Sequence, residues 1–174
     1  MTSPAMPAPL DPAGPAAASL ERHRGALERL ARRLVWDPEE ARDVVQAAYL
    51  DALVARASLE EPLAAEAWLR RIVINRALSH LRRRRLWRVV AAVLRVAEEP
   101  LAPGVEEDAE RRAHQAALAR ALERRPARQA VAFTLRYLEG QSLDEVAEAL
   151  GVSRGTVRVH LQRAVRALRE EGVL

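Results

Sequence analysis

The spacing of apolar residues is the feature that most constrains how this 174-residue chain can fold. Near its start, Leu20, Leu27, Leu30 and Leu34 recur at three-, four- and seven-residue intervals, which places them on one face of a helix. Alanine, leucine, valine, arginine and glutamate dominate the composition, and aromatic residues make up 3% of it. Such a composition favours helices and leaves little material for a sheet. We therefore expect an all-α fold.

The distribution of charge divides the chain into segments. Residues 1–19 are rich in proline and carry a single charge, so we predict a disordered leader there. Residues 20–97 and 113–174 carry net charges of +6 and +3, whereas residues 98–112 carry −4 and two prolines. The pattern predicts two small helical domains joined by a flexible acidic linker. A net charge of +4 mildly favours a polyanionic partner.

Several classes of function are excluded by what the sequence lacks. The absence of cysteine excludes a disulfide framework, a thiol nucleophile and cysteine-ligated zinc. The four histidines lie far apart and form no helical pair of metal ligands. No apolar run approaches the roughly 18 residues of a membrane span, and the start lacks the pattern of a signal peptide. We expect a cytoplasmic protein without cofactor, metal or small-molecule ligand.

Capping signals set the expected helix boundaries. Asp37 and Pro38 should begin a helix that runs to about Arg56. A further helix should follow Pro62 and pass through the 82–85 arginine cluster, with a separate, shorter amphipathic helix over residues 86–97. The second domain should hold helices over residues 110–123, 127–138, 143–150 and 154–171.

Residues 142–171 carry the most specific local pattern, a helix-turn-helix. A capping box begins at Ser142, Gly151 fits the turn, and Ser153 caps a longer helix with an apolar stripe. On the other face, arginine can bond guanine edges in the major groove, while groups near the helix start suit phosphate. The predicted DNA-contacting residues are Ser153, Arg154, Thr156, Arg158, Gln162, Arg163 and Arg166. A plain helical hairpin with a solvated arginine face is the alternative.

The segment SLDEVAEALGVSRGTVRVHLQRAVRALRE closely resembles the carboxy-terminal promoter-reading region of bacterial sigma factors, in particular the small extracytoplasmic-function (ECF) type. The match rests on Gly155-Thr156-Val157-Arg158 and Arg163-Ala164, which follow the turn at the family's spacing. It departs at Val165, where a second basic residue is common. The resemblance implies that this helix-turn-helix reads the minus-35 promoter element.

The helix predicted over residues 39–56 has a second face that its core does not need. Asp43, Gln46, Ala47 and Leu50 share this face through their spacing. Taken alone, the face is most simply an ordinary solvated surface. The segment DPEEARDVVQAAYLDAL, however, resembles the sigma subregion that docks on the polymerase clamp coiled coil. That resemblance implies that these four residues bind core RNA polymerase, with Ala47 standing where the family usually has an acid.

The helix predicted through residues 64–85 carries one narrow polar strip. The strip consists of Trp68, Arg71, Asn75, Ser79 and Arg82. An aromatic ring and an amide among arginines suit a single nucleic-acid strand, although a core tryptophan beside a solvated helix end is the alternative. AWLRRIVINRALSHLRRRR also resembles the sigma segment that captures the melted minus-10 element. The resemblance implies that Trp68, Arg71, Asn75, Arg76 and Ser79 line that site.

Taken together, the two domains predict a sigma factor that binds core RNA polymerase and directs it to specific promoters. The implied partners are core polymerase and promoter DNA, and an anti-sigma factor is a further candidate partner. The alternative is a stand-alone helix-turn-helix regulator whose first domain dimerises or binds an effector. An enzymatic function such as serine recombination is disfavoured, because the sequence shows no acidic metal cluster and no catalytic serine beside a sheet.

Overall fold

The computed structural model describes residues 15–55, 65–94 and 109–174, and every regular element in these ranges is helical. The elements are α1 (Pro15–Val35), α2 (Pro38–Val54), α3 (Ala65–Leu94), α4 (Ala109–Glu123), α5 (Ala127–Phe133), the π-helix η3 (Thr134–Leu138), α6 (Leu143–Leu150) and α7 (Arg154–Glu170). The all-α prediction is confirmed. None of the helices in the described ranges is long and apolar enough to cross a membrane.

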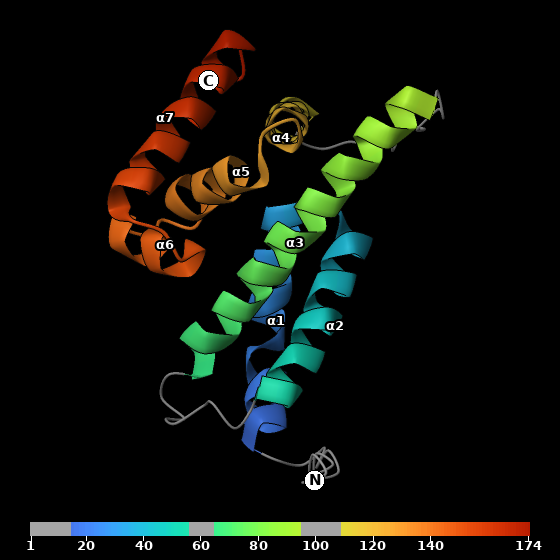
Figure 1. The fold of residues 1–174 in the computed structure, drawn as a ribbon, viewed down its shortest axis with the longest axis vertical. Coiled ribbons are helices and arrows are strands. Elements are labelled where there is room, and N and C mark those ends of the chain that lie inside the picture. Colours follow the sequence, from blue (N-terminus) through green and yellow to red (C-terminus); the bar gives the residue numbers. More distant parts are fainter. Residues whose placement is uncertain (1–14, 56–64, 95–108) are drawn as a thin grey trace, which may run out of the picture.

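The first module is a three-helix bundle of α1, α2 and α3 (Figure 1). The helical leucine pattern lies inside it, because Leu27, Leu30 and Leu34 are all buried. The predicted cap of α2 is confirmed: Asp37 accepts hydrogen bonds from the backbone N–H groups of Glu39 (2.8 Å) and Glu40 (2.9 Å). This cap satisfies donors that the first turn leaves free and fixes where α2 begins.

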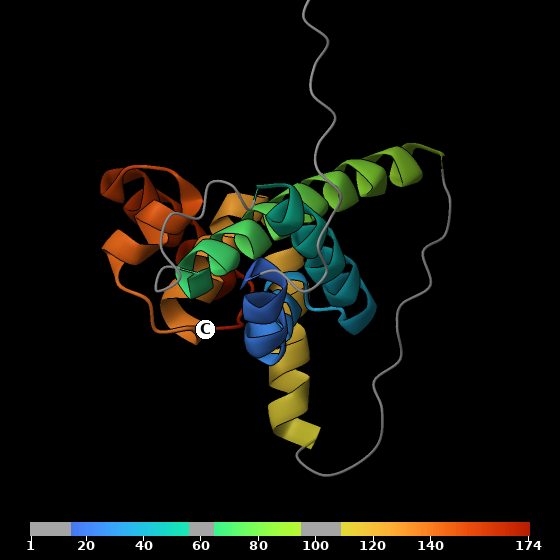
Figure 2. The ribbon, with the colours of Figure 1, turned by 90° about the horizontal axis from the view of Figure 1, so that it is seen from below.

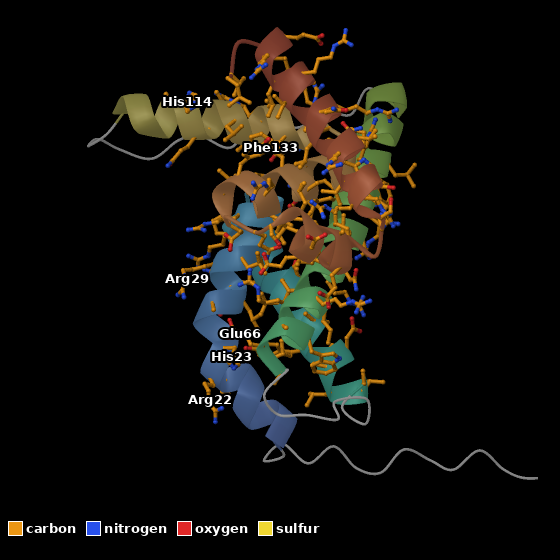
Figure 3. All side chains as sticks on the ribbon, turned by 90° about the vertical axis from the view of Figure 1, so that its left-hand side faces the viewer. Arg22, His23, Arg29, Glu66, His114 and Phe133 are labelled. Atoms are coloured by element: carbon orange, nitrogen blue, oxygen red, sulfur yellow. The ribbon has the colours of Figure 1, made fainter. Side chains whose placement is uncertain are left out.

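The second module contains the helix-turn-helix, formed by α6 and α7. The capping box at Ser142 is present, and Gly151 adopts the left-handed conformation that ends α6, with φ at 61°. Ser153 then caps α7, whose predicted apolar stripe is buried. The amino-terminal half of α4 projects away from the other helices (Figure 2). Phe133, at the end of α5, is buried within the protein (Figure 3).

Three predicted boundaries differ from the structure. Helix α1 begins at Pro15, inside the predicted leader, because proline is tolerated in a first turn and alanines follow it. Helix α3 continues to Leu94, so the separate helix expected over residues 86–97 was wrong. No proline or glycine interrupts α3, and extending a helix is easier than nucleating a new one. Helix α4 begins at Ala109, within the predicted linker.

The remaining residues of the predicted leader and linker, 1–14 and 98–108, lie outside the described residues, and the domain boundaries stay a prediction.

The two modules pack against each other along α3. Contacts join α3 to α5 and α6, and α1 to η3. One buried cluster contains Leu78 and Leu81 from the first module together with Leu135, Val146 and Val157 from the second. Figure 1 shows the resulting arrangement, in which α5 and α6 lie beside α3. The two basic segments therefore share a hydrophobic core, which the sequence did not predict.

Candidate nucleic-acid interface

The start of α7 is fixed by two hydroxyl groups. The backbone N–H of Thr156 donates to Ser153 Oγ (3.2 Å), and the two side-chain oxygens lie 2.9 Å apart. The Ser153 hydroxyl is therefore engaged in capping the helix, which orients the free backbone N–H groups of the first turn toward solvent. A contact between Ser153 and DNA stays a prediction.

The polar residues of α7 lie opposite its buried stripe. Those whose side chains are exposed are Arg154, Arg158, Gln162, Arg163 and Arg166, whereas Thr156 is half-buried. Arg154 pairs with Asp144 (3.4 Å) and Arg166 with Glu170 (2.8 Å). Within the described ranges Arg158 and Arg163 have no ion-pair partner, so their guanidinium groups are free to contact DNA.

An open groove of about 610 Å³ runs along this face of α7. Arg158, Gln162 and Arg166 line it, and so do Arg136 and Tyr137 from η3. The sequence does not indicate Arg136 and Tyr137, because they belong to another element and no local pattern connects η3 with α7. Arg169 also lines the groove, and its position one turn after Arg166 could have indicated it. The groove is concave and basic, which suits a polyanion.

His160 lies on α7 beside the exposed arginines. Burial of its ring lowers the pKa of His160 below its ordinary value, and the charges of Arg128 and Arg163 lower it further. Its Nδ1 atom is buried and has no hydrogen-bond partner among the residues that the structure describes. The folded state therefore favours the neutral ring, whereas the unfolded chain takes up a proton near pH 6.5.

We expect acidification through pH 6.5 to destabilise the wild type more than the His160→Gln variant. Stability from the neutral ring is present above the unfolded pKa and is lost as the pH falls below it, because the unfolded state then binds more protons. Urea unfolding of both proteins at pH 7.5 and pH 5.5 measures the difference, and the other three histidines are common to both. Equal losses of stability in the two proteins would contradict this assignment.

The predicted strip on α3 is a continuous surface. Arg71, Asn75, Ser79 and Arg82 are exposed, and Trp68 is half-buried, with part of its ring packed against the core. Ser79 Oγ donates to the Asn75 carbonyl (3.0 Å), which holds the hydroxyl close to the helix. The strip therefore presents an aromatic face, an amide and two guanidinium groups along one side of α3. These are the groups that stack on bases and neutralise phosphates.

Arg76 lies apart from the other predicted minus-10 residues. It points toward α2, where its guanidinium pairs with Asp51 through two short hydrogen bonds. Hydrogen bonding from Arg76 holds the pKa of the Asp51 carboxyl below its usual range. The structure thus gives Arg76 a role in joining α2 to α3, and any contact with DNA would require this pair to break.

The predicted polymerase-binding face of α2 is accessible. Asp43, Gln46 and Leu50 are exposed, and Ala47 is half-buried. Asp43 and Ala47 line a groove of about 490 Å³ between α2 and α3. The opposite wall includes Trp87, whose side chain is 70% exposed and which the sequence analysis did not single out.

Glu40 connects this face of α2 to α3. His80 Nε2 lies 3.0 Å from its carboxylate, which also accepts a short hydrogen bond from Arg84. Burial raises the pKa of Glu40, but its interactions with His80 and Arg84 outweigh burial, so its pKa lies below the usual value. The pairs at Glu40 and Asp51 together hold α2 and α3 in register along the groove.

Comparisons with known proteins match each of the two modules to a family model. Residues 20–86 match the family model "Sigma-70 region 2", and residues 115–168 match "Sigma-70, region 4". The first match contains the α2 face and the α3 strip, and the second contains the helix-turn-helix. Both modules are thereby matched to one family, which favours a sigma factor over a stand-alone helix-turn-helix regulator.

Individual relatives support the same family. The chain is 38% identical over 146 residues to the RNA polymerase sigma-E factor of Streptomyces coelicolor, covering 84% of this chain and 79% of the relative. It is 35% identical over 148 residues to the ECF RNA polymerase sigma factor SigM of Mycobacterium tuberculosis, covering 82% of this chain and 69% of the relative.

A solved structure is also similar: the sigma factor RpoE of Bartonella quintana, crystallised with the anti-sigma factor NepR. The alignment has a TM-score of 0.62 and 27% identity and covers 88% of this chain and 93% of that one. Both modules and the identity to these relatives show that this chain belongs to the extracytoplasmic-function family of RNA polymerase sigma factors.

Proposed function

We propose that this sigma factor binds core RNA polymerase and directs it to specific promoters by means of three separate surfaces. The exposed face of α2 binds the polymerase, the strip on α3 holds the melted minus-10 strand, and the outer face of α7 reads the minus-35 element. The chemistry of RNA synthesis belongs to the polymerase, and this chain supplies recognition alone.

The single observation that carries the proposal is that one chain carries two different surfaces whose chemistry suits nucleic acid. The α7 groove is concave and lined by arginines, which suits the backbone and base edges of a duplex. The α3 strip instead presents Trp68 next to Arg71 and Asn75, and stacking of this kind requires an unpaired base. A regulator that binds duplex DNA alone has no use for the second surface.

The α2 face supports the polymerase contact by its chemistry. It combines an acid and an amide, Asp43 and Gln46, with Leu50, whose side chain is 59% exposed. The face therefore offers a charged, an amide and an apolar group to a protein partner. We include an anti-sigma factor as a further partner, because the similar Bartonella quintana protein was solved in complex with one.

We expect Asp43→Arg to weaken association with core polymerase by at least tenfold while changing the free energy of unfolding by less than about 0.5 kcal/mol. The side chain is exposed, so the fold does not depend on it, whereas the new charge opposes a surface that accepts an acid. Competition for core polymerase against a labelled wild-type chain measures the effect.

Glu21→Arg is the matched control, since it makes the same change of charge at an exposed position on α1. It should compete like the wild type. Equal competition by Asp43→Arg and the control would remove α2 from the polymerase interface, and unfolding of Asp43→Arg would show that Asp43 is structural.

A further inference from the structure

Helix α7 carries one large apolar side chain in the middle of its exposed face. Val159 is 41% exposed, and neither buried cluster of the described residues includes it. At about 100° per residue, its position on the helix is opposite the stripe that faces the core. That stripe consists of Val157, Leu161, Ala164 and Leu168. Val159 therefore points away from the rest of the module.

The residues around Val159 are polar or lack a side chain. Gln162 and Arg163 follow it by three and four residues, so they flank it on the same face, and both are exposed. Gly155 precedes it by four residues. A helical side chain leans over the turn before its own Cα, so Val159 leans toward this glycine, which has no side chain to cover the valine methyl groups.

Internal packing does not account for this glycine. A Cβ atom added at Gly155 would meet Ser153 Oγ at 3.8 Å, which is an ordinary contact, and alanine forms helices better than glycine does. The described part of the chain would therefore accept a larger residue at this position. What the glycine does allow is the close approach of an external surface to the backbone of α7, directly beside Val159.

A single exposed valine is ordinary on a protein surface, so the place of Val159 decides its role. It is not among the residues that line the open groove of α7, which lies to one side of it. It stands instead on the ridge of the helix, opposite the core. When a recognition helix enters the major groove, the residues on this ridge come nearest to the base edges.

The chemistry of this ridge suits an A·T pair. Thymine is the base that presents a methyl group in the major groove, whereas the other bases present hydrogen-bonding groups there. Val159 can contact a methyl group but can neither donate nor accept a hydrogen bond. Gln162, one turn away, can form two hydrogen bonds with adenine, the partner of thymine.

We infer that Val159 contacts the methyl group of a thymine in the minus-35 element and thereby selects an A·T pair at that position. The contact removes the valine methyl groups and the thymine methyl group from water together, which is favourable for apolar surface. This inference rests on the minus-35 role proposed above for α7, and it adds a base to that role.

Deoxyuridine tests the contact, because it pairs like thymidine and lacks only the methyl group. The probe is a promoter duplex that the holoenzyme of this chain and core polymerase selects from fragmented genomic DNA. Each thymidine of its minus-35 element, on either strand, is replaced in turn. We expect one replacement to weaken binding of the wild-type holoenzyme about threefold, the effect of losing one buried methyl group.

The Val159→Ala holoenzyme should bind the unmodified promoter more weakly than the wild type and show no further loss with deoxyuridine at that position. Alanine is a better helix former than valine, so α7 should persist, and thermal unfolding checks this. Val54→Ala is the matched control, because Val54 is an exposed valine at the end of α2. It should keep the full loss. The ratio of affinities for the two duplexes is compared within each protein, so a change in polymerase affinity cancels.

Equal losses in the wild type and Val159→Ala at every thymidine would assign the methyl contact to another group and overturn the inference. No loss at any thymidine, or a minus-35 element without an A·T pair, would overturn it as well. Failure of the proposed function has a different result. A holoenzyme that selects no promoter contradicts both, whereas promoter selection that does not depend on the methyl group contradicts this inference alone.

Discussion

Replacing Arg71 and Asn75 together by alanine should leave closed-complex formation on duplex promoter DNA largely intact and reduce open-complex formation at least tenfold. Both side chains are exposed on the α3 strip, so their loss should not disturb the core. Contacts to an unpaired strand act only after the duplex has melted, and an arginine contributes to them by following the strand's phosphate backbone and by cation–π contact with bases. Permanganate reactivity of unpaired thymines measures the open complex.

A promoter that is already melted should not fully rescue this double variant, because the missing contacts are made to the single strand itself. Arg29→Ala/Gln115→Ala is a matched control at exposed positions away from the strip, and it should open promoters normally. Trp68 is left unchanged because its ring also packs against the core, where truncation leaves a cavity. Normal strand opening by Arg71→Ala/Asn75→Ala would remove the strip from the minus-10 assignment.

Replacing Arg158 or Arg163 by alanine should weaken binding to the minus-35 element by about 1–3 kcal/mol for a contact to a base. Neither arginine has an ion-pair partner within the described residues, so the substitution breaks no ion pair there. Loss of a base contact should also relax the sequence preference at one promoter position, whereas loss of a phosphate contact should weaken all promoters alike. Holoenzyme binding to a series of minus-35 variants distinguishes the two cases.

Arg120→Ala is the corresponding control, an exposed arginine near the end of α4 and outside the α7 groove. It should bind every promoter of the series with wild-type affinity. Wild-type affinity for both Arg158→Ala and Arg163→Ala, with unchanged thermal unfolding, would contradict the assignment of α7 as the reading helix.

Local features of the fold could be predicted from the sequence because local residues determine them. Asp37, Ser142 and Ser153 each sit at a helix start where their oxygens accept backbone hydrogen bonds, and Gly151 supplies the left-handed residue of the turn. The buried stripe of α7 follows from helical periodicity in the same way. The predicted length of α3 is wrong. The apolar pattern changes near residue 86, but no helix breaker stands there and the helix continues to Leu94.

Features that join distant segments could not be predicted. Nothing near Glu139 in the sequence indicates that it pairs with Arg33 and Arg70, and nothing near Trp36 indicates that its ring contacts the second module. Arg76 is adjacent to Asn75, yet one step along a helix turns its side chain by about 100° toward Asp51. Periodicity assigns residues to faces, but which faces meet is decided by packing between elements.

We propose above that this chain gives core RNA polymerase its choice of promoter. Transcription by purified core polymerase with and without the chain, on fragmented genomic DNA of the source organism, tests the claim most directly. We expect the chain to direct initiation to a small set of start sites that share one sequence element near minus 10 and one near minus 35. Equal initiation with and without the chain, or binding to duplex DNA as a dimer without polymerase, would contradict it.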